Sequence, residues 1–123
     1  MQIPQLYIAT SSYGRGVYTA AGIPKGAVIE VCHVIVIPKA ELPVIHRTSL
    51  HDYYFLWGTD MQQCAIALGY GSLYNHAIHP NANFILDIAN HTIDIEAIAD
   101  IPAGSEITIN YHGEPGDEES LWF

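Results

Sequence analysis

The 123-residue chain contains only two cysteines, Cys32 and Cys64. Both stand in apolar surroundings, "EVCHV" and "QQCAIA", which indicates two reduced, buried thiols rather than a disulfide or a metal pair. This usage fits a reducing, intracellular compartment, either the cytoplasm or, in a eukaryotic host cell, the nucleus. Half of the residues are hydrophobic, so a single domain of this length can bury a core that needs no covalent cross-links.

Basic residues are also few: four lysines and arginines face 13 aspartates and glutamates, for a formal net charge of −9 at pH 7. Direct binding of nucleic acid is not expected, because lysine and arginine must neutralise the phosphates there. A cationic partner, such as a basic peptide, would be attracted instead. The alternative is that the charge only keeps the domain in solution.

A long hydrophobic run is lacking as well. The longest, residues 27–38, is interrupted by Glu30 and His33 and is too short to cross a bilayer. Residues 1–15 lack the basic region followed by an apolar region that marks a secretory signal. The sequence therefore predicts neither a membrane span nor secretion.

No amphipathic pattern is long enough for a substantial helix, and the apolar residues predict a mostly β fold. Ile93 and Ile95 alternate with Asp94 and Glu96, as expected of a half-buried strand. Short helical turns are expected within 39–51 and 70–78. Strands are expected over residues 6–9, 17–20, 28–37, 53–57, 64–68, 84–88 and 92–98, and within 105–113.

The pattern Ile-Pro-x-Gly-x-x-Ile occurs twice, at residues 23–29 and 101–107. Proline presets φ and glycine supplies a positive φ, so each copy predicts a tight turn from which a strand departs. Two similarly built corners favour folded-over β ribbons rather than a parallel sheet.

Three polar segments interrupt the apolar pattern: "YGRG" (13–16), "NHAIHPN" (75–81) and "SEITINYHG" (105–113). Gly-x-Gly lets a ligand approach the backbone closely, although a hairpin turn is the simpler interpretation. Asn75 and His76 need hydrogen-bonding partners if they are buried. Tyr111 ends an alternating strand, and with a pKa of ~10 a phenol orients a substrate better than it acts as a base.

In this order, the three motifs resemble the SET-domain family of protein lysine methyltransferases. The resemblance covers nearly the whole chain through "GRGVYTAAGIPKGAVIEV", "LGYGSLYNHAIHPNANF" and "IPAGSEITINYHG", and is greatest to minimal stand-alone SET proteins of viral and bacterial type. It implies small curved β-sheets, little helix and a C-terminal pseudoknot that brings the Asn-His segment against the Tyr segment. The SET domain would span residues 1–113, followed by a short acidic tail, 114–123, whose aromatic end packs on the cofactor site.

The resemblance also implies the activity and the site residues. S-adenosyl-methionine would be the cofactor, and a lysine side chain of a basic protein such as a histone tail would accept the methyl group. Tyr111 would be the active-site tyrosine, and Asn81 would lock the pseudoknot. Substrate contacts are implied for Tyr53, Trp57 and Leu73, with Tyr54 as an open alternative. Cofactor contacts are implied for Arg15, Gly16, Tyr74, Asn75, His76 and Trp122, with Phe123 as an alternative to Trp122.

Two departures from the family pattern matter. Ala77 stands where the family often has serine after Asn-His, and the cysteine cluster that follows many eukaryotic members is absent, so no zinc is expected. The lysine channel then needs closure by the short tail or by a second subunit, which makes a homodimer a further expectation. Two other hypotheses remain open: an inactive SET-like module that binds basic peptides, and a metal protein that uses His76, His79 and His91.

Overall fold

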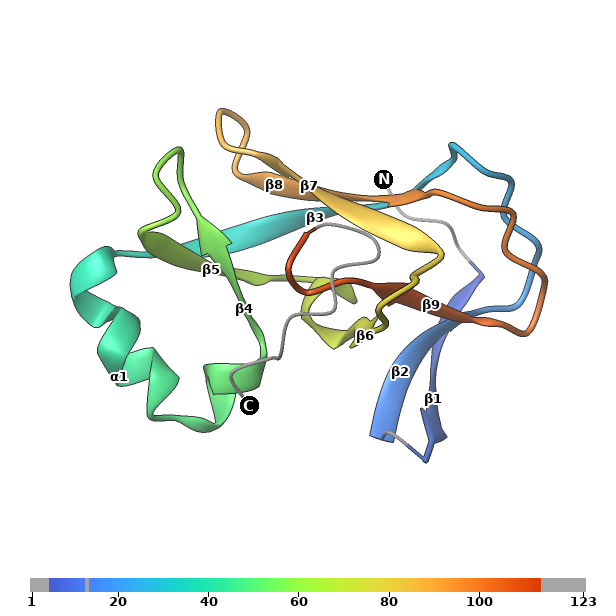
Figure 1. Cartoon of the computed structure of the whole chain (residues 1–123), viewed down its shortest axis with the longest axis horizontal. Helices are drawn as coiled ribbons and strands as arrows, with labels where there is room; N and C mark the ends of the chain where they lie inside the picture. Colours follow the sequence, from blue (N-terminus) through green and yellow to red (C-terminus); the bar gives the residue numbers. More distant parts are fainter. Residues whose placement is uncertain (1–4, 13, 114–123) are drawn as a thin grey trace.

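The computed structural model describes residues 5–12 and 14–113, and most of its regular structure is strand (Figure 1). The strands form a four-stranded sheet of order β1-β2-β9-β6 and a five-stranded sheet of order β4-β5-β3-β8-β7. The mostly β fold class predicted from the sequence is confirmed. The strands are β1 (Leu6–Ser11), β2 (Gly14–Thr19), β3 (Val28–Ile37), β4 (Tyr54–Trp57), β5 (Gln63–Ala67), β6 (Asn75–His76), β7 (Ala82–Asp87), β8 (Thr92–Ala97) and β9 (Glu106–Ile109).

Within the described residues, helical structure is confined to short turns, which lie in the predicted ranges 39–51 and 70–78 except that one of them extends to Asp52. The longest is α1 (Leu42–His46), flanked by the 3₁₀ helices η1 (Lys39–Glu41) and η2 (Ser49–Asp52), and η3 (Gly71–Leu73) precedes β6. In the described part of the chain no helix has the length and apolar character needed to cross a membrane.

Strand β3 forms the middle of the five-stranded sheet, between β5 and β8. Its partner β8 has the alternation expected from the sequence: Ile93 and Ile95 are fully buried, whereas Asp94 and Glu96 are half-buried. Each buried isoleucine contributes about 1.5–3 kcal/mol of apolar transfer free energy. Burial of these side chains therefore stabilises the five-stranded sheet.

The two Ile-Pro-x-Gly corners lie against each other. Ile23 and Ile101 form an antiparallel bridge in which each amide donates to the other carbonyl at 2.8 Å. Gly26 and Gly104 both have a positive φ, of 89° and 84°, which the tight turns require. Because one corner leads into β3 and the other into β9, the bridge holds the starts of these two strands together.

Strand β9, near the end of the described chain, brings three distant segments together. It pairs antiparallel with β2 and parallel with β6. Asn81 fixes it further, since its Nδ2 donates to the Glu106 carbonyl at 2.8 Å and its Oδ1 accepts from the Thr108 amide at 2.9 Å. The Gly-x-Gly, Asn-His and Tyr motifs consequently converge on one region, as the SET resemblance implies.

Candidate active site

The Gly-x-Gly segment forms the start of β2 and packs directly on the other two motifs. Ser11 and Gly14 are the last paired residues of the β1–β2 hairpin, and Gly14 has a φ of 96°. A Cβ at Gly16 would collide with the Glu106 carboxylate and would lie 2.8 Å from Nδ2 of Asn75. Gly16 therefore permits the close approach of β2 to Asn75 and Glu106.

The side chain of Asn75 is held by both of its donors. Its Nδ2 donates to the Arg15 carbonyl at 3.0 Å and to Oε2 of Glu106 at 2.7 Å. No described residue donates to its Oδ1. Because both N–H groups of the amide are committed, the group that Asn75 can offer to a ligand is this acceptor, which would pair with an N–H or O–H group. Asn75 lines a cavity of about 180 Å³ together with Gly14, Arg15, Tyr53, Ser72, Leu73 and Tyr111.

Tyr111 follows β9 and lies against the Asn-His segment. Its phenol donates to the Tyr74 carbonyl at 2.7 Å, and its amide donates to Nδ1 of His76 at 3.0 Å. The rings of His76 and Tyr111 have centroids 5.1 Å apart. Because Nδ1 of His76 accepts a hydrogen bond, the proton of the neutral imidazole belongs on Nε2.

The environment of Tyr111 keeps its phenol protonated. Burial, followed by the nearby Tyr53, Asp52 and Glu106, raises the pKa of Tyr111 to about 12. At neutral pH this group is a hydrogen-bond donor and acceptor but a poor general base.

A second cavity, of about 240 Å³, adjoins the first and is mostly apolar. Tyr53, Ser72 and Tyr111 line both cavities, so these three residues stand where the cavities meet. Asp52 supplies a carboxylate to the lining of the second cavity. Its other lining residues are Tyr54, Phe55, Leu56, Met61, Gly71, Tyr74, Phe84, Leu86, His112 and Gly113.

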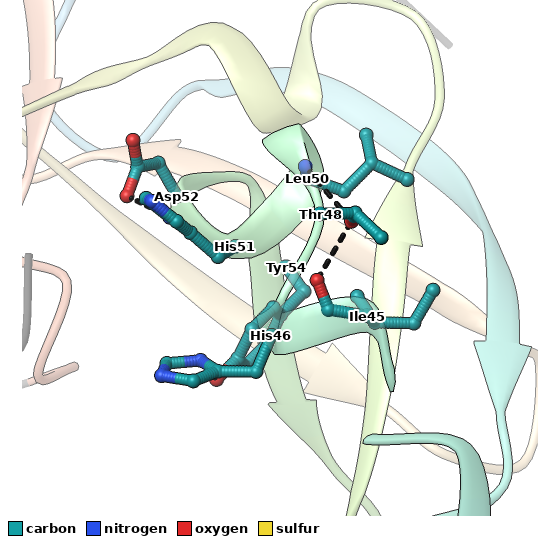
Figure 2. A network of polar contacts seen from close by, with 7 residues as sticks. All are labelled: Ile45, His46, Thr48, Leu50, His51, Asp52 and Tyr54. Atoms are coloured by element: carbon teal, nitrogen blue, oxygen red, sulfur yellow. Dashed lines mark hydrogen bonds and ion pairs between the residues drawn. The ribbon is translucent and has the colours of Figure 1, made fainter. Parts of the chain in front are cut away.

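Figure 2 shows a polar network within residues 45–54, the segment to which Tyr53 belongs in the sequence. Thr48 donates through its hydroxyl to the Ile45 carbonyl at 2.7 Å and accepts from the Leu50 amide at 3.2 Å, which caps η2. On either side of Tyr53, Nδ1 of His51 pairs with Asp52 at 2.8 Å, and Nδ1 of His46 lies 3.0 Å from the Tyr54 hydroxyl. The sequence predicts a strand from residue 53, but β4 begins one residue later, at Tyr54. Tyr53 therefore lies between η2 and β4.

The structure gathers most of the residues that the sequence predicts for the site. Arg15, Leu73, Asn75 and Tyr111 line the first cavity, and His76 contacts Tyr111. Tyr53, the preferred substrate residue, lines both cavities, and its alternative Tyr54 lines the apolar one.

Four predicted residues do not line the cavity expected of them. Gly16 packs against Glu106 and Asn75, and His76 contacts Tyr111, but neither Gly16 nor His76 lines either cavity. Trp57 is 1% exposed and belongs to the hydrophobic core, and it lines neither cavity. Tyr74, predicted as a cofactor contact, is also 1% exposed and lines the apolar cavity rather than the polar one. Trp122 and Phe123, together with the rest of the predicted tail, lie outside the described residues.

Sequence reasoning missed two carboxylates. Glu106 binds Asn75, and Glu30, 2% exposed, accepts from the phenol of Tyr74. The available signal for Glu30 was its position as the single acid inside the apolar run 27–38. Within residues 5–12 and 14–113, no three histidine, cysteine, aspartate or glutamate side chains form a group that could hold a metal ion.

Comparison with known proteins identifies the class that this fold and site define. Residues 14–112 match the SET domain, which is nearly the whole described chain. The chain therefore belongs to the SET domain family, and it is an enzyme of the protein-lysine N-methyltransferase class.

Particular relatives agree with this assignment. Over 115 residues, 93% of this chain and 73% of the relative, it is 34% identical to the Schizosaccharomyces pombe "Histone-lysine N-methyltransferase, H3 lysine-37 specific". A solved candidate histone methyltransferase of Plasmodium falciparum has 32% identity and a TM-score of 0.68, with 87% of this chain and 92% of that chain covered. A chain of ctPRC2, solved with H3K27me3 and H3K27M, has 22% identity and a TM-score of 0.71 over 86% of this chain and 14% of its own, which supports the fold alone.

Proposed function

We propose that the chain transfers the methyl group of S-adenosyl-methionine to the side-chain amine of a lysine in a basic protein such as a histone tail. The observation that carries this proposal is the meeting of a polar and an apolar cavity at Tyr53 and Tyr111. A charged methyl donor and an alkyl amine need such opposite surroundings, and they must meet end to end for an in-line displacement.

The polar cavity suits the cofactor. Oδ1 of Asn75 is an acceptor without a described donor, and the amino group of S-adenosyl-methionine is a cationic donor. Gly14 lines the cavity without a side chain, so a ligand can approach the backbone closely there, and Arg15 adds a positive charge to the lining. S-adenosyl-methionine would supply an activated methyl group on a positively charged sulfur.

The apolar cavity suits the alkyl chain of the substrate lysine. The amine must lose a proton before its lone pair can attack, and at pH ~7.4 this costs about 4 kcal/mol for a pKa of ~10.4. A mostly apolar, aromatic lining lowers that cost because desolvation disfavours the ammonium form. The phenol oxygen of Tyr111, whose proton is directed at the Tyr74 carbonyl, orients the amine. The new N–C bond forms as the C–S bond breaks, and the extra proton on nitrogen leaves to solvent.

A basic substrate is supported by the charge of the chain and by its relatives. The net charge of −9 attracts a cationic peptide. The printed names of the Schizosaccharomyces pombe and Plasmodium falciparum relatives both refer to histones. A histone tail is therefore our preferred substrate, and it would place the protein with chromatin.

The direct test measures S-adenosyl-methionine binding by calorimetry and then transfer of labelled methyl to histone H3 tail peptides. The control peptides carry arginine in place of each lysine, which keeps the charge and removes the acceptor. We expect saturable cofactor binding and labelling only of the lysine peptides. Cofactor or peptide binding without any labelling would favour the inactive peptide-binding module instead.

Salt is expected to weaken the capture of a basic peptide. Raising the ionic strength from ~0.05 M to ~0.5 M shortens the Debye length from about 14 Å to about 4 Å and screens the negative surface. KM for the peptide should rise severalfold, whereas kcat should change little because the surface charge acts on the capture of the peptide rather than on methyl transfer in the bound complex. Initial rates at a series of peptide concentrations provide the measurement. A KM that is independent of salt would remove the steering role of the net charge.

The rate of methyl transfer should rise with pH and should show no decrease caused by ionisation of Tyr111. Over pH 7 to pH 10, the chemical rate is expected to increase as more of the bound amine becomes neutral, and to level off near the pKa of that amine, which desolvation lowers below the free value of ~10.4. Tyr111 keeps its proton over this range, since its raised pKa is about 12. Single-turnover rates at saturating peptide measure the profile, with circular dichroism at each pH as the control for folding. A decline that begins below pH 10 while the fold persists would contradict the protonated, orienting role.

A further inference from the structure

Glu30 is the only buried charged residue in the described part of the chain, with 2% of its surface exposed. Burying a carboxylate costs several kcal/mol unless its oxygens are hydrogen-bonded. Both oxygens of Glu30 have donors: Oε1 accepts from the phenol of Tyr74 at 2.7 Å, and Oε2 accepts from the amide of Tyr70 at 3.0 Å. Glu30 therefore ties the segment that precedes Asn75 to β3.

The surroundings of Glu30 are fitted to this arrangement. Gly69 has a φ of 67°, and a Cβ at this position would collide with the Glu30 carboxylate. Burial, and then the charge of Glu30, raises the pKa of Tyr74 well above its usual range, so the Tyr74 phenol remains a donor. The Tyr74 phenol has little freedom to move, because Tyr74 is 1% exposed and its hydroxyl is bonded to a buried carboxylate.

Tyr74 connects this anchor to the active-site phenol. Its side chain reaches Glu30, while its backbone carbonyl accepts the proton of Tyr111 at 2.7 Å. β3 belongs to the five-stranded sheet, whereas Tyr111 follows β9 of the four-stranded sheet. The route from Glu30 through Tyr74 to Tyr111 therefore links the two sheets at the point where the cavities meet.

We propose that Glu30 and Tyr74 are positioning residues that fix the direction of the Tyr111 phenol. This inference rests on the proposed function, because it assigns the phenol of Tyr111 to the methyl transfer. With its proton held by a fixed carbonyl, the phenol oxygen presents its lone pairs to the cavities in one orientation. Loss of the anchor loosens the Tyr74 carbonyl and lowers kcat, while the Asn75 contacts that would hold the cofactor remain.

A double-mutant cycle tests the route. Tyr74→Phe, Tyr111→Phe and the double variant are compared by single-turnover transfer of labelled methyl at saturating cofactor and histone H3 tail peptide. Tyr74→Phe is expected to reduce the rate about tenfold with peptide KM and cofactor Kd within twofold of the unaltered protein. In the Tyr111→Phe background it should reduce the rate by less than twofold, because the phenol through which it acts is gone.

Tyr70→Phe is the matched control. It removes a phenol that donates to the Leu6 carbonyl at 3.5 Å and leaves the Tyr70 amide bond to Glu30 intact. We expect its rate to stay within twofold. Equal losses from Tyr74→Phe in both backgrounds would show a general structural effect and overturn the inference, as would an unchanged rate in the single variant.

Glu30→Gln provides a second, independent variant if Tyr74→Phe does not fold. Its amide keeps the volume of the carboxylate and one acceptor, and the same pattern is expected: a lower rate with Tyr111 present and little change without it. A loss of equal size in both backgrounds would again overturn the inference. If Tyr111→Phe alone is as active as the unaltered protein, the proposed role of Tyr111 fails. If Tyr111→Phe is impaired and Tyr74→Phe is not, only the positioning role fails.

Discussion

Replacing Tyr111 with phenylalanine is expected to reduce kcat by about 100-fold or more while S-adenosyl-methionine affinity stays within severalfold. The substitution removes one oxygen atom, and the ring keeps its contact with His76 at a centroid separation of 5.1 Å. The hydrogen bond to the Tyr74 carbonyl is lost, and with it the oxygen that orients the amine. Misplacement of a reacting group by about 1 Å costs on the order of 100-fold in rate.

Labelled-methyl transfer measures kcat for this variant, and calorimetry measures cofactor affinity. Tyr18→Phe is a suitable control, because Tyr18 lies on β2, stacks on Tyr7 with centroids 5.7 Å apart and lines neither cavity. It should retain full activity. Unchanged turnover in Tyr111→Phe would contradict the assignment of this phenol to the reaction, whereas a parallel loss of cofactor affinity would indicate that the substitution disturbs the polar cavity.

Local chemistry made much of the fold predictable. The alternation of Ile93 and Ile95 with charged residues depends only on which face of a strand is buried, and the structure reproduces it. The Ile-Pro-x-Gly turns depend on the φ preferences of proline and glycine, and both glycines have a positive φ. Such features need no knowledge of distant partners, so the sequence alone contains them.

Features that depend on distant partners were not predictable from residue patterns. Strand β6 has two residues and exists because it pairs with β9, more than 30 residues later in the chain. Tyr53 lies between η2 and β4 rather than in the strand, so the alternation of strand side chains does not predict where it points. For Trp57, membership of a strand left open whether the ring faces a cavity or the core, and it faces the core.

The same limit applied to the site. The convergence of the three motifs was available only through the family resemblance, because pairing between the middle and the end of a chain leaves no local pattern. Glu106 illustrates this point: in the sequence it is one acid in a strand, and in the structure it lies between Gly16 and Asn75. Gly16, Asn75 and Glu106 therefore depend on one another: the Glu106 carboxylate binds the Asn75 amide in space that a side chain at position 16 would fill.

Asn75→Asp is expected to weaken S-adenosyl-methionine binding by about 100-fold, although the two side chains have nearly the same shape. The new carboxylate would face the Glu106 carboxylate at the 2.7 Å position and the Arg15 carbonyl at the 3.0 Å position, so three acceptors would meet without a donor. Two carboxylates at this separation repel each other, or one of them takes up a proton at a raised pKa. Calorimetric titration with the cofactor measures the loss, which should diminish as the pH is lowered towards 5.

Asn90→Asp is the matched control for this change. Nδ2 of Asn90 also donates to a carboxylate, that of Asp87 at 2.8 Å, but the pair is solvent-exposed and lines neither cavity. It alters the net charge by the same amount, and exposed pairs of this kind contribute about 0–1 kcal/mol. Cofactor affinity should therefore be unchanged in Asn90→Asp.

Adding Glu106→Gln to Asn75→Asp separates repulsion from loss of shape. The glutamine amide can donate to the new aspartate, which restores one donor and acceptor pair in the reverse direction and leaves only the Arg15 carbonyl without its donor. We expect the double variant to recover about tenfold of the lost affinity. An Asn75→Asp variant that binds the cofactor normally would place the cofactor away from this amide. A double variant without any recovery would mean that Asn75 acts through its own Nδ2 contacts to the Arg15 carbonyl rather than through its pairing with Glu106.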